Sequence, residues 1–289
     1  MFIQVLQSTV ACAERVFEIL DEKEEQDPVL TRFTPEVQNA GTVRGAVSLN
    51  SISFRYMPEQ PLIENLSLDV EPRHVVAIVG PTGAGKTTLV NLLMRFYELD
   101  SGDITIDGRP VQELSRAQLR SHFGMVLQDT WLFGGTIYEN IAFGRPDAER
   151  EEVIAAATAA HADHFIRTLP EGYDTVLNED VSNLSQGQKQ LLTIARAILA
   201  DPDILILDEA TSNVDTRTEM QIQQAMKKLM SNRTSFVIAH RLSTIRDAEK
   251  ILVMNEGRII EQGTNAELME KKGFYHELFL AQFSEPVPA

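Results

Sequence analysis

Residues 79–93 read VGPTGAGKTTLVNLL, and this stretch decides the fold. Gly80, Gly85, Lys86 and Thr87 match the pattern G-x-x-x-x-G-K-[ST], in which a glycine-rich loop turns backbone N–H groups toward phosphate oxygens. The apolar run HVVAIVG before the loop predicts a buried strand, and KTTLVNLLMRFY after it predicts a helix with its positive end at the phosphates. The stretch therefore predicts a phosphate site between a strand and a helix.

A second chemical signal lies at the end of another apolar run, ILILDEA. Asp208 and Glu209 follow this predicted strand at the edge where sheets of this kind open onto their ligands. We expect Asp208 to hold magnesium through its water shell and Glu209 to orient or deprotonate the attacking water. Adjacent side chains of a regular strand face opposite ways, so both roles require the strand to end here.

Composition limits the class of protein. The 289 residues are 43% hydrophobic and 24% charged, which is typical of a globular chain with a sizeable core. Forty-two acidic residues against 26 basic ones give a net charge of -16, so nucleic acid is not expected as a partner. Cys12 is the only cysteine, which excludes an internal disulfide and fits a reducing compartment. The sequence contains no run of 18 apolar residues, the length that would predict a membrane-crossing helix.

The order of patterns along the chain predicts its organisation. Residues 2–20 have apolar side chains at helical spacing, predicting an amphipathic helix that either packs on its own domain or is the cut end of something larger. A charged linker follows to about Gly45. From Ala46, short alternations predict strands at one edge of a sheet. The runs AEREEVIAAATAAHADHFIRTL and SQGQKQLLTIARAILA predict a helical insertion over about residues 129–199, after which a parallel sheet resumes.

The segment LSQGQ at 184–188 adds a second predicted anion site. Ser185 can cap the helix that starts here, and Gly187 allows a close backbone approach. The loop at 80–88 holds only one triphosphate, so a second anion site indicates a ligand shared at a subunit interface.

These motifs together resemble the nucleotide-binding domain of an ATP-binding cassette (ABC) transporter, of the exporter kind whose membrane helices precede the ATPase. The resemblance covers roughly residues 46–283. In the family's order the motifs are Tyr56, GPTGAGKTT at 80–88, Gln128 in VLQDT, LSQGQ at 184–188, ILILDE at 204–209, SNVD at 212–215 and IAHR at 239–242.

The resemblance implies an α/β fold with a P-loop NTPase (RecA-like) core, an antiparallel β subdomain and an inserted α-helical subdomain. It also implies three segments: the end of the last transmembrane helix with its linker at 1–45, the ATPase domain at 46–285, and a tail at 286–289.

The resemblance also assigns roles to residues, with ATP and Mg²⁺ as ligands. Tyr56 would stack on adenine, a contact worth about 1–3 kcal/mol. Gln128 would sense magnesium and the attacking water, and His240 would contact the γ-phosphate. The residues expected to catalyse are Glu209, His240 and Gln128. Those expected to bind nucleotide are Tyr56, Gly80, Pro81, Thr82, Gly83, Ala84, Gly85, Lys86, Thr87, Thr88, Ser185, Gly187, Gln188 and Asp215. Those expected to bind the metal are Thr87, Gln128 and Asp208.

In the family, two domains meet head to tail, so Ser185, Gly187 and the loop with Ser212 and Asp215 would serve the nucleotide of a second nucleotide-binding domain. ATP closes the pair and hydrolysis reopens it, which drives export by a transmembrane domain. Two departures stand out: Gln186 replaces the first glycine of LSGGQ, and NEDVSN before it lacks the Gly-rich form. The motifs also resemble two-chain exporters, in which this chain would be the hydrolytically intact half.

Other interpretations stay open. A soluble cassette protein for DNA repair or translation would carry coiled-coil insertions or two cassettes, and a nucleotide-gated module would not hydrolyse ATP. Trp131 and Phe133 fit core packing and contact with the membrane domain equally well. Lipid, drug and peptide all remain possible as cargo, and so do self-pairing and pairing with another chain. The expected location is the cytoplasmic face of a membrane, with this fragment by itself soluble.

Overall fold

The computed structural model describes residues 2–22, 43–128, 130–178, 181–208, 214–239 and 242–283. The chain divides into two units, residues 1–39 and residues 40–289. The first unit contains α1 (Phe2–Leu20), as its helical spacing predicts, and the side chains from Gln4 onward in this helix are exposed. Among the described helices, α1 included, none is both long and apolar enough to cross a bilayer.

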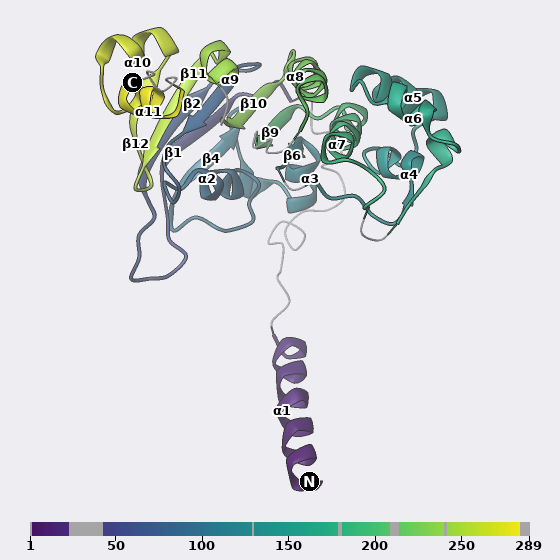
Figure 1. Cartoon of the computed structure of the whole chain (residues 1–289). Coiled ribbons are helices and arrows are strands. Elements are labelled where there is room, and N and C mark those ends of the chain that lie inside the picture. The colour runs from purple at the N-terminus through teal and green to yellow at the C-terminus, as the bar shows by residue number, and fades with distance from the viewer. Residues whose placement is uncertain are drawn as a thin grey trace, which may run out of the picture. The chain divides into compact units, whose positions relative to one another are not determined.

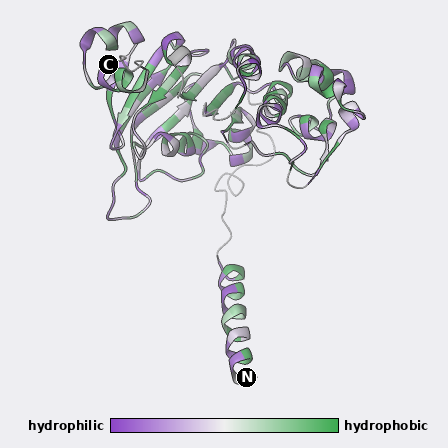
Figure 2. Ribbon diagram, in the orientation of Figure 1, coloured by the Kyte–Doolittle hydropathy of each residue, from purple (hydrophilic) through white to green (hydrophobic). Residues whose placement is uncertain are grey.

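A six-stranded sheet in the order β12-β11-β3-β10-β9-β6 forms the centre of the second unit (Figure 1). Five strands run parallel, and β12 is antiparallel to β11. The bounds are Val75–Val79 for β3, Phe123–Val126 for β6, Ile204–Asp208 for β9, Thr234–Ile238 for β10, Lys250–Asn255 for β11 and Arg258–Gly263 for β12. The inner strands are largely hydrophobic (Figure 2), because helices or a second sheet cover both of their faces.

A second, antiparallel sheet has the order β2-β1-β4-β5. Its strands are β1 (Val47–Phe54), β2 (Ile63–Val70), β4 (Ser101–Ile106) and β5 (Arg109–Pro110). The strands after Ala46 make a layer of their own, which confirms the expected antiparallel β subdomain. The physical reason is their single apolar face: Leu49 and Ile52 share one buried core with Ile78 of β3 and Leu89 of the intervening α2 (Lys86–Leu93).

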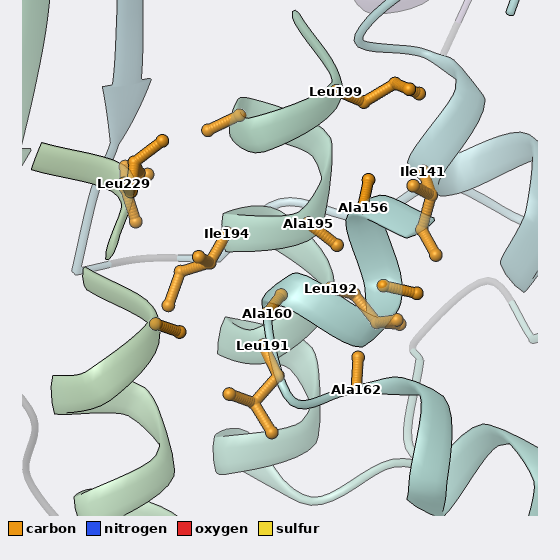
Figure 3. Packing of buried hydrophobic residues seen from close by; sticks show 14 of the residues in the cluster. Ile141, Ala156, Ala160, Ala162, Leu191, Leu192, Ile194, Ala195, Leu199 and Leu229 are labelled. Atoms are coloured by element: carbon orange, nitrogen blue, oxygen red, sulfur yellow. The ribbon is translucent and has the colours of Figure 1, made fainter. Parts of the chain in front are cut away.

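The helical insertion lies beside β6 (Figure 1). It contains the small hairpin of β7 (Gly135–Thr136) and β8 (Val176–Leu177), and the helices α4 (Ile137–Ala142), α5 (Arg150–Ala159), α6 (Asp163–Thr168) and α7 (Gln186–Ala200). One face of α7 packs on α4 and α5, and another packs on α8 (Thr216–Met230). Figure 3 shows Leu192 and Ala195 on the side of Ala156 and Ile141, and Ile194 on the side of Leu229.

The run AEREEVIAAATAAHADHFIRTL has one helical spacing but forms two helices. His161 takes a left-handed φ of 59° after α5. The N–H of Ala162 then bonds the carbonyl of Ala157 at 2.8 Å, and the N–H of His161 bonds the carbonyl of Thr158 at 3.1 Å. This is a Schellman motif, which satisfies the last carbonyls of α5 and ends the helix.

The remaining elements complete the outer layers. They are the 3-10 turns Val111–Glu113 and Gly172–Asp174, α3 (Arg116–Ser121), α9 (Leu242–Asp247), α10 (Asn265–Lys271) and α11 (Phe274–Phe283). The helices α9 to α11 share a third core with β3 and β11, in which Tyr275 is almost fully buried.

Candidate functional site

Three parallel strands bring the predicted site residues to one edge of the sheet. Gly80 directly follows β3, Asp208 is the last residue of β9, and Gln128 comes two residues after β6. Only β10 separates β3 from β9, so these two strand ends lie about 10 Å apart. The structure describes β9 as far as Asp208, and Glu209, on which the expected end of the strand depends, lies outside the described residues.

Some predicted residues lie outside the described part of the chain. Glu209, Ser212 and His240 belong to this group. By sequence, Glu209 directly follows the end of β9, and His240 comes two residues after the end of β10.

The phosphate loop has the backbone that its glycines permit. Gly80, Gly83 and Gly85 have φ of 152°, 83° and 95°, values that favour glycine. The Lys86 ammonium donates to the carbonyls of Gly80 at 2.7 Å and Pro81 at 2.9 Å, so its side chain lies across the loop. Gly85 begins α2 without any described side chain capping it, which leaves the first N–H groups of the helix available to an anion.

The electrostatics at Lys86 involve the second motif. Burial lowers the pKa of Lys86, while the negative charge of Asp208 acts in the opposite direction and favours the ammonium. The loop cation and the strand-end carboxylate are therefore close enough to interact. The arrangement can bind a triphosphate and a cation side by side.

Gly80→Ala and Gly83→Ala provide a matched test of this loop. A Cβ on Gly80 would lie 2.1 Å from the carbonyl oxygen of Met254 in β11, whereas a Cβ on Gly83 meets no described atom within 4 Å. Both substitutions carry the cost of a positive φ, but only Gly80→Ala must also displace backbone. We expect urea unfolding to show Gly80→Ala as less stable than Gly83→Ala by about 1–3 kcal/mol. Equal midpoints for the two variants would contradict this geometry.

The predicted adenine-stacking residue lies beside the phosphate loop. The Tyr56 hydroxyl is 3.2 Å from the Thr88 hydroxyl. Its ring makes edge-to-face contacts with Phe54 and Tyr97, at centroid distances of 4.8 and 5.0 Å. Tyr56 is still 50% exposed, so part of its ring remains accessible to a base.

The predicted metal-binding side chains suit magnesium by their chemistry. Thr87, Gln128 and Asp208 offer a hydroxyl, an amide and a carboxylate, which are the hard oxygen ligands that Mg²⁺ takes together with water. Thr87 is exposed in the first turn of α2, and Gln128 is exposed after β6. The donor set at this edge of the sheet therefore fits the ion.

The LSQGQ segment forms the start of α7. Ser185 caps the helix: its hydroxyl accepts from the Gln188 N–H at 3.3 Å, and the Gln188 side chain accepts from the Ser185 N–H at 2.9 Å. Gly187 is buried, and a Cβ there would lie 2.4 Å from the Thr218 methyl group. The close approach at Gly187 is thus made by α8 of the same chain, which sequence reasoning did not foresee.

Asp215 begins the neighbouring helix. Its carboxylate accepts the Thr218 N–H at 3.0 Å and caps α8, and this backbone hydrogen bond lowers the pKa of Asp215. Because Gly187 packs on Thr218 as well, the starts of α7 and α8 are tied together. Ser185 and Asp215 are both exposed, so the N-terminal ends of α7 and α8 are both open to a ligand or partner.

Three aromatic rings form a cluster that we call the aromatic surface: Trp131, Phe133 and Phe143. Their centroids lie 5.8 to 6.2 Å apart. Trp131 is 61% and Phe143 58% exposed, so the explanation of Trp131 by core packing is wrong. Phe143 was missed in the sequence because it falls at the end of α4, where helical spacing does not separate exposed from buried positions.

Comparison with known proteins gives the site its context. The ABC transporter family model matches residues 63–212. The fatty acid ABC transporter ATP-binding/permease protein of Mycobacterium tuberculosis is 58% identical over 94% of this chain and 42% of its own length. The ATP-dependent lipid A-core flippase of Chromobacterium violaceum is 45% identical over 98% of this chain and 47% of its own length.

A solved structure agrees with these sequence matches. A bacterial Atm1-family ABC exporter with ATP bound has a TM-score of 0.84 and 40% identity, covering 98% of this chain and 49% of the exporter chain. The chain thus spans less than half the length of these relatives. With its P-loop core, antiparallel β subdomain and helical subdomain, the chain belongs to the ABC transporter family, and its second unit is the ATPase domain of that family.

Proposed function

We propose that this chain binds and hydrolyses MgATP and that hydrolysis powers an exporter. The observation that supports the proposal is that β3, β9 and β6 end at the same edge of the sheet, where the charge of Asp208 acts on Lys86 and where Gln128 also lies. A phosphate cradle alone would fit any nucleotide switch. The added carboxylate and amide supply what hydrolysis needs at the γ-phosphate.

Each residue then has a role. Tyr56 holds the base, and the N–H groups of residues 80–88 with Lys86 hold the phosphates. Thr87, Gln128 and Asp208 would hold magnesium, which when bound neutralises phosphate charge. Glu209 polarises or deprotonates the attacking water, and His240 positions it at the γ-phosphate.

We further propose that the site is completed by a second nucleotide-binding domain. Ser185 caps α7 at an exposed helix start. The positive end of the helix dipole and the Ser185 hydroxyl can bind an anion there, and that anion would be a nucleotide held by the phosphate loop of another chain. A head-to-tail partner would bring its ATP to this start and to Asp215. We propose this chain as the hydrolytically intact member of such a pair, whether the partner is a copy or a homologue.

The membrane partner follows from the relatives. They are named as ATP-binding/permease proteins or flippases and are about twice as long as this chain. We propose that residues 1–45 are the end of a membrane helix with its linker, that 46–285 are the ATPase domain, and that 286–289 are a tail. The aromatic surface then docks on the membrane domain, at the cytoplasmic face of the membrane. Fatty acid and lipid A-core are lipids, so we propose a lipid as cargo.

Phosphate release from MgATP tests the proposal. If a second copy completes the site, the rate per chain rises with chain concentration, and chelating magnesium with EDTA abolishes it. Ser185→Arg removes the capping hydroxyl and fills the place of the partner's phosphate with a long side chain, so this variant should bind ATP and lose the concentration-dependent rate. A rate per chain that is the same at all concentrations would contradict the shared site, and no release at all would contradict hydrolysis by this chain alone.

A further inference from the structure

Arg196 connects the helix α7 to the aromatic surface. Its guanidinium donates from Nε to the carbonyl of Asn140 at 2.8 Å, from Nη1 to the carbonyl of Trp131 at 3.1 Å, and from Nη2 to Oδ1 of Asn140 at 3.2 Å. It also lies over two rings, 5.2 Å from the centroid of Phe143 and 5.9 Å from that of Trp131. Burial lowers the pKa of Arg196. One side chain of α7 therefore fixes both exposed rings.

Asn140 holds the other side of this arrangement. It is fully buried, and its Oδ1 accepts the Phe133 N–H at 3.1 Å. Its Nδ2 donates to the carbonyls of Phe133 at 3.0 Å and Thr136 at 3.1 Å. Asn140 thus ties the backbone of Phe133, the third residue of the aromatic surface, to the same guanidinium. Buried hydrogen-bond networks of this kind are rigid when every member is satisfied.

The contact between α4 and α7 leaves little room for slippage. A Cβ on Gly144, just after α4, would lie 2.3 Å from the carbonyl oxygen of Arg196. Figure 3 shows the packed interior of this region, where Leu192 and Leu199 of α7 lie near Ile141 of α4. A displacement of the aromatic surface must therefore move α7 with it.

The other end of α7 carries Ser185. Arg196 is eleven positions further along the chain, which is about 16 Å along a helix. A second contact reaches the same start: Gln186 Nε2 donates to the Thr130 hydroxyl at 3.4 Å. Thr130 directly precedes Trp131. These two neighbouring residues therefore contact α7 at Gln186, near its start, and at Arg196, near its end. Gln186 is the residue that departs from LSGGQ, and here it makes a contact that glycine lacks.

We infer that Arg196, held by Asn140, couples the aromatic surface to the start of α7, so that a displacement of the aromatic surface changes the position of Ser185. Arg196 is a positioning residue in this account, since it acts through α7. The inference rests on the proposed function for its purpose: the surface meets the membrane domain, and Ser185 meets the partner's ATP. The coupling itself is a property of this chain and is testable without nucleotide.

Hydrogen exchange tests the coupling in the isolated chain. The readout is exchange at Gln188 and Lys189, whose N–H groups bond Ser185 at the start of α7. Phe143→Ala removes one ring from the surface, and we expect it to speed exchange there about threefold or more. In an Arg196→Lys background, which keeps the charge but not the forked hydrogen bonds, the same change should have less than a twofold effect.

A matched control comes from Arg150 on α5. Its guanidinium stacks 5.3 Å from the Tyr138 centroid and pairs with Asp174. Arg150 therefore makes the same kind of contact with an aromatic ring as Arg196 does, but with a ring outside the aromatic surface. In an Arg150→Lys background, Phe143→Ala should retain its full effect at Gln188 and Lys189. If Phe143→Ala acts equally in the parent and Arg196→Lys backgrounds, or acts in neither, the coupling is overturned.

Trp131 provides a second readout because it is the only tryptophan of the chain. In a Glu209→Gln background, pairing on MgATP should shift its fluorescence, and Arg196→Lys should remove the shift while light scattering still shows the pair. A shift that persists in Arg196→Lys pairs overturns the coupling. Absence of pairs in the parent background speaks against the proposed function instead, and hydrogen exchange then decides the coupling alone.

Discussion

Lys86→Met is expected to lower MgATP hydrolysis at least about a hundredfold and to weaken ATP binding as well. The Lys86 ammonium lies across the phosphate loop on the carbonyls of Gly80 and Pro81, close to the Asp208 charge. Methionine has nearly the same length and no charge, so it removes the point charge that faces the phosphates. Losing one such electrostatic contact typically costs a factor of about 10² to 10³ in rate.

The matched control for this variant is Lys250→Met. Lys250 also donates its ammonium to a backbone carbonyl, that of Asp69 at 2.6 Å, but it lies at the start of β11 and thus at the opposite edge of the sheet. Phosphate release and titration with a fluorescent ATP analogue should show Lys250→Met as unchanged. A Lys86→Met variant that hydrolyses within threefold of the parent would contradict the assigned site.

Glu209→Gln is expected to stop turnover while ATP stays bound. Glutamine has the shape of glutamate but accepts no proton, and general-base groups contribute a factor of about 10² to 10⁴. Lys86, Thr87 and Asp208 are untouched, so binding should persist. Rapid-quench turnover measures the rate, and gel filtration with labelled ATP measures retention. Hydrolysis at the parental rate would remove Glu209 from the proposed mechanism, and loss of ATP would indicate a binding role instead.

The part of the site that sequence predicts is the part encoded locally. The loop at 80–88 needs a strand before it and a helix after it, and both are visible as runs of apolar residues of the right length. The strand β9 up to Asp208 is likewise predicted by its apolar run. The capping by Ser185 follows from a serine placed three residues before Gln188.

The part that sequence misses depends on contacts between distant residues. Arg196 and Asn140 are 56 positions apart, and nothing local distinguishes Arg196 from a solvated helix arginine. Gly187 fits a ligand-binding glycine equally well until Thr218 is placed against it. The antiparallel β subdomain was expected from the resemblance and not from the strands themselves, since alternation shows one buried face without showing which layer covers it.

The most direct test of the shared site is the mass of the Glu209→Gln chain in solution by light scattering, with and without MgATP. The account predicts one chain without nucleotide and two chains with MgATP, and it predicts that Ser185→Arg in the same background returns the mass to one chain. ATP-bound Glu209→Gln that stays at the mass of one chain at all concentrations would contradict completion of the site by a second copy.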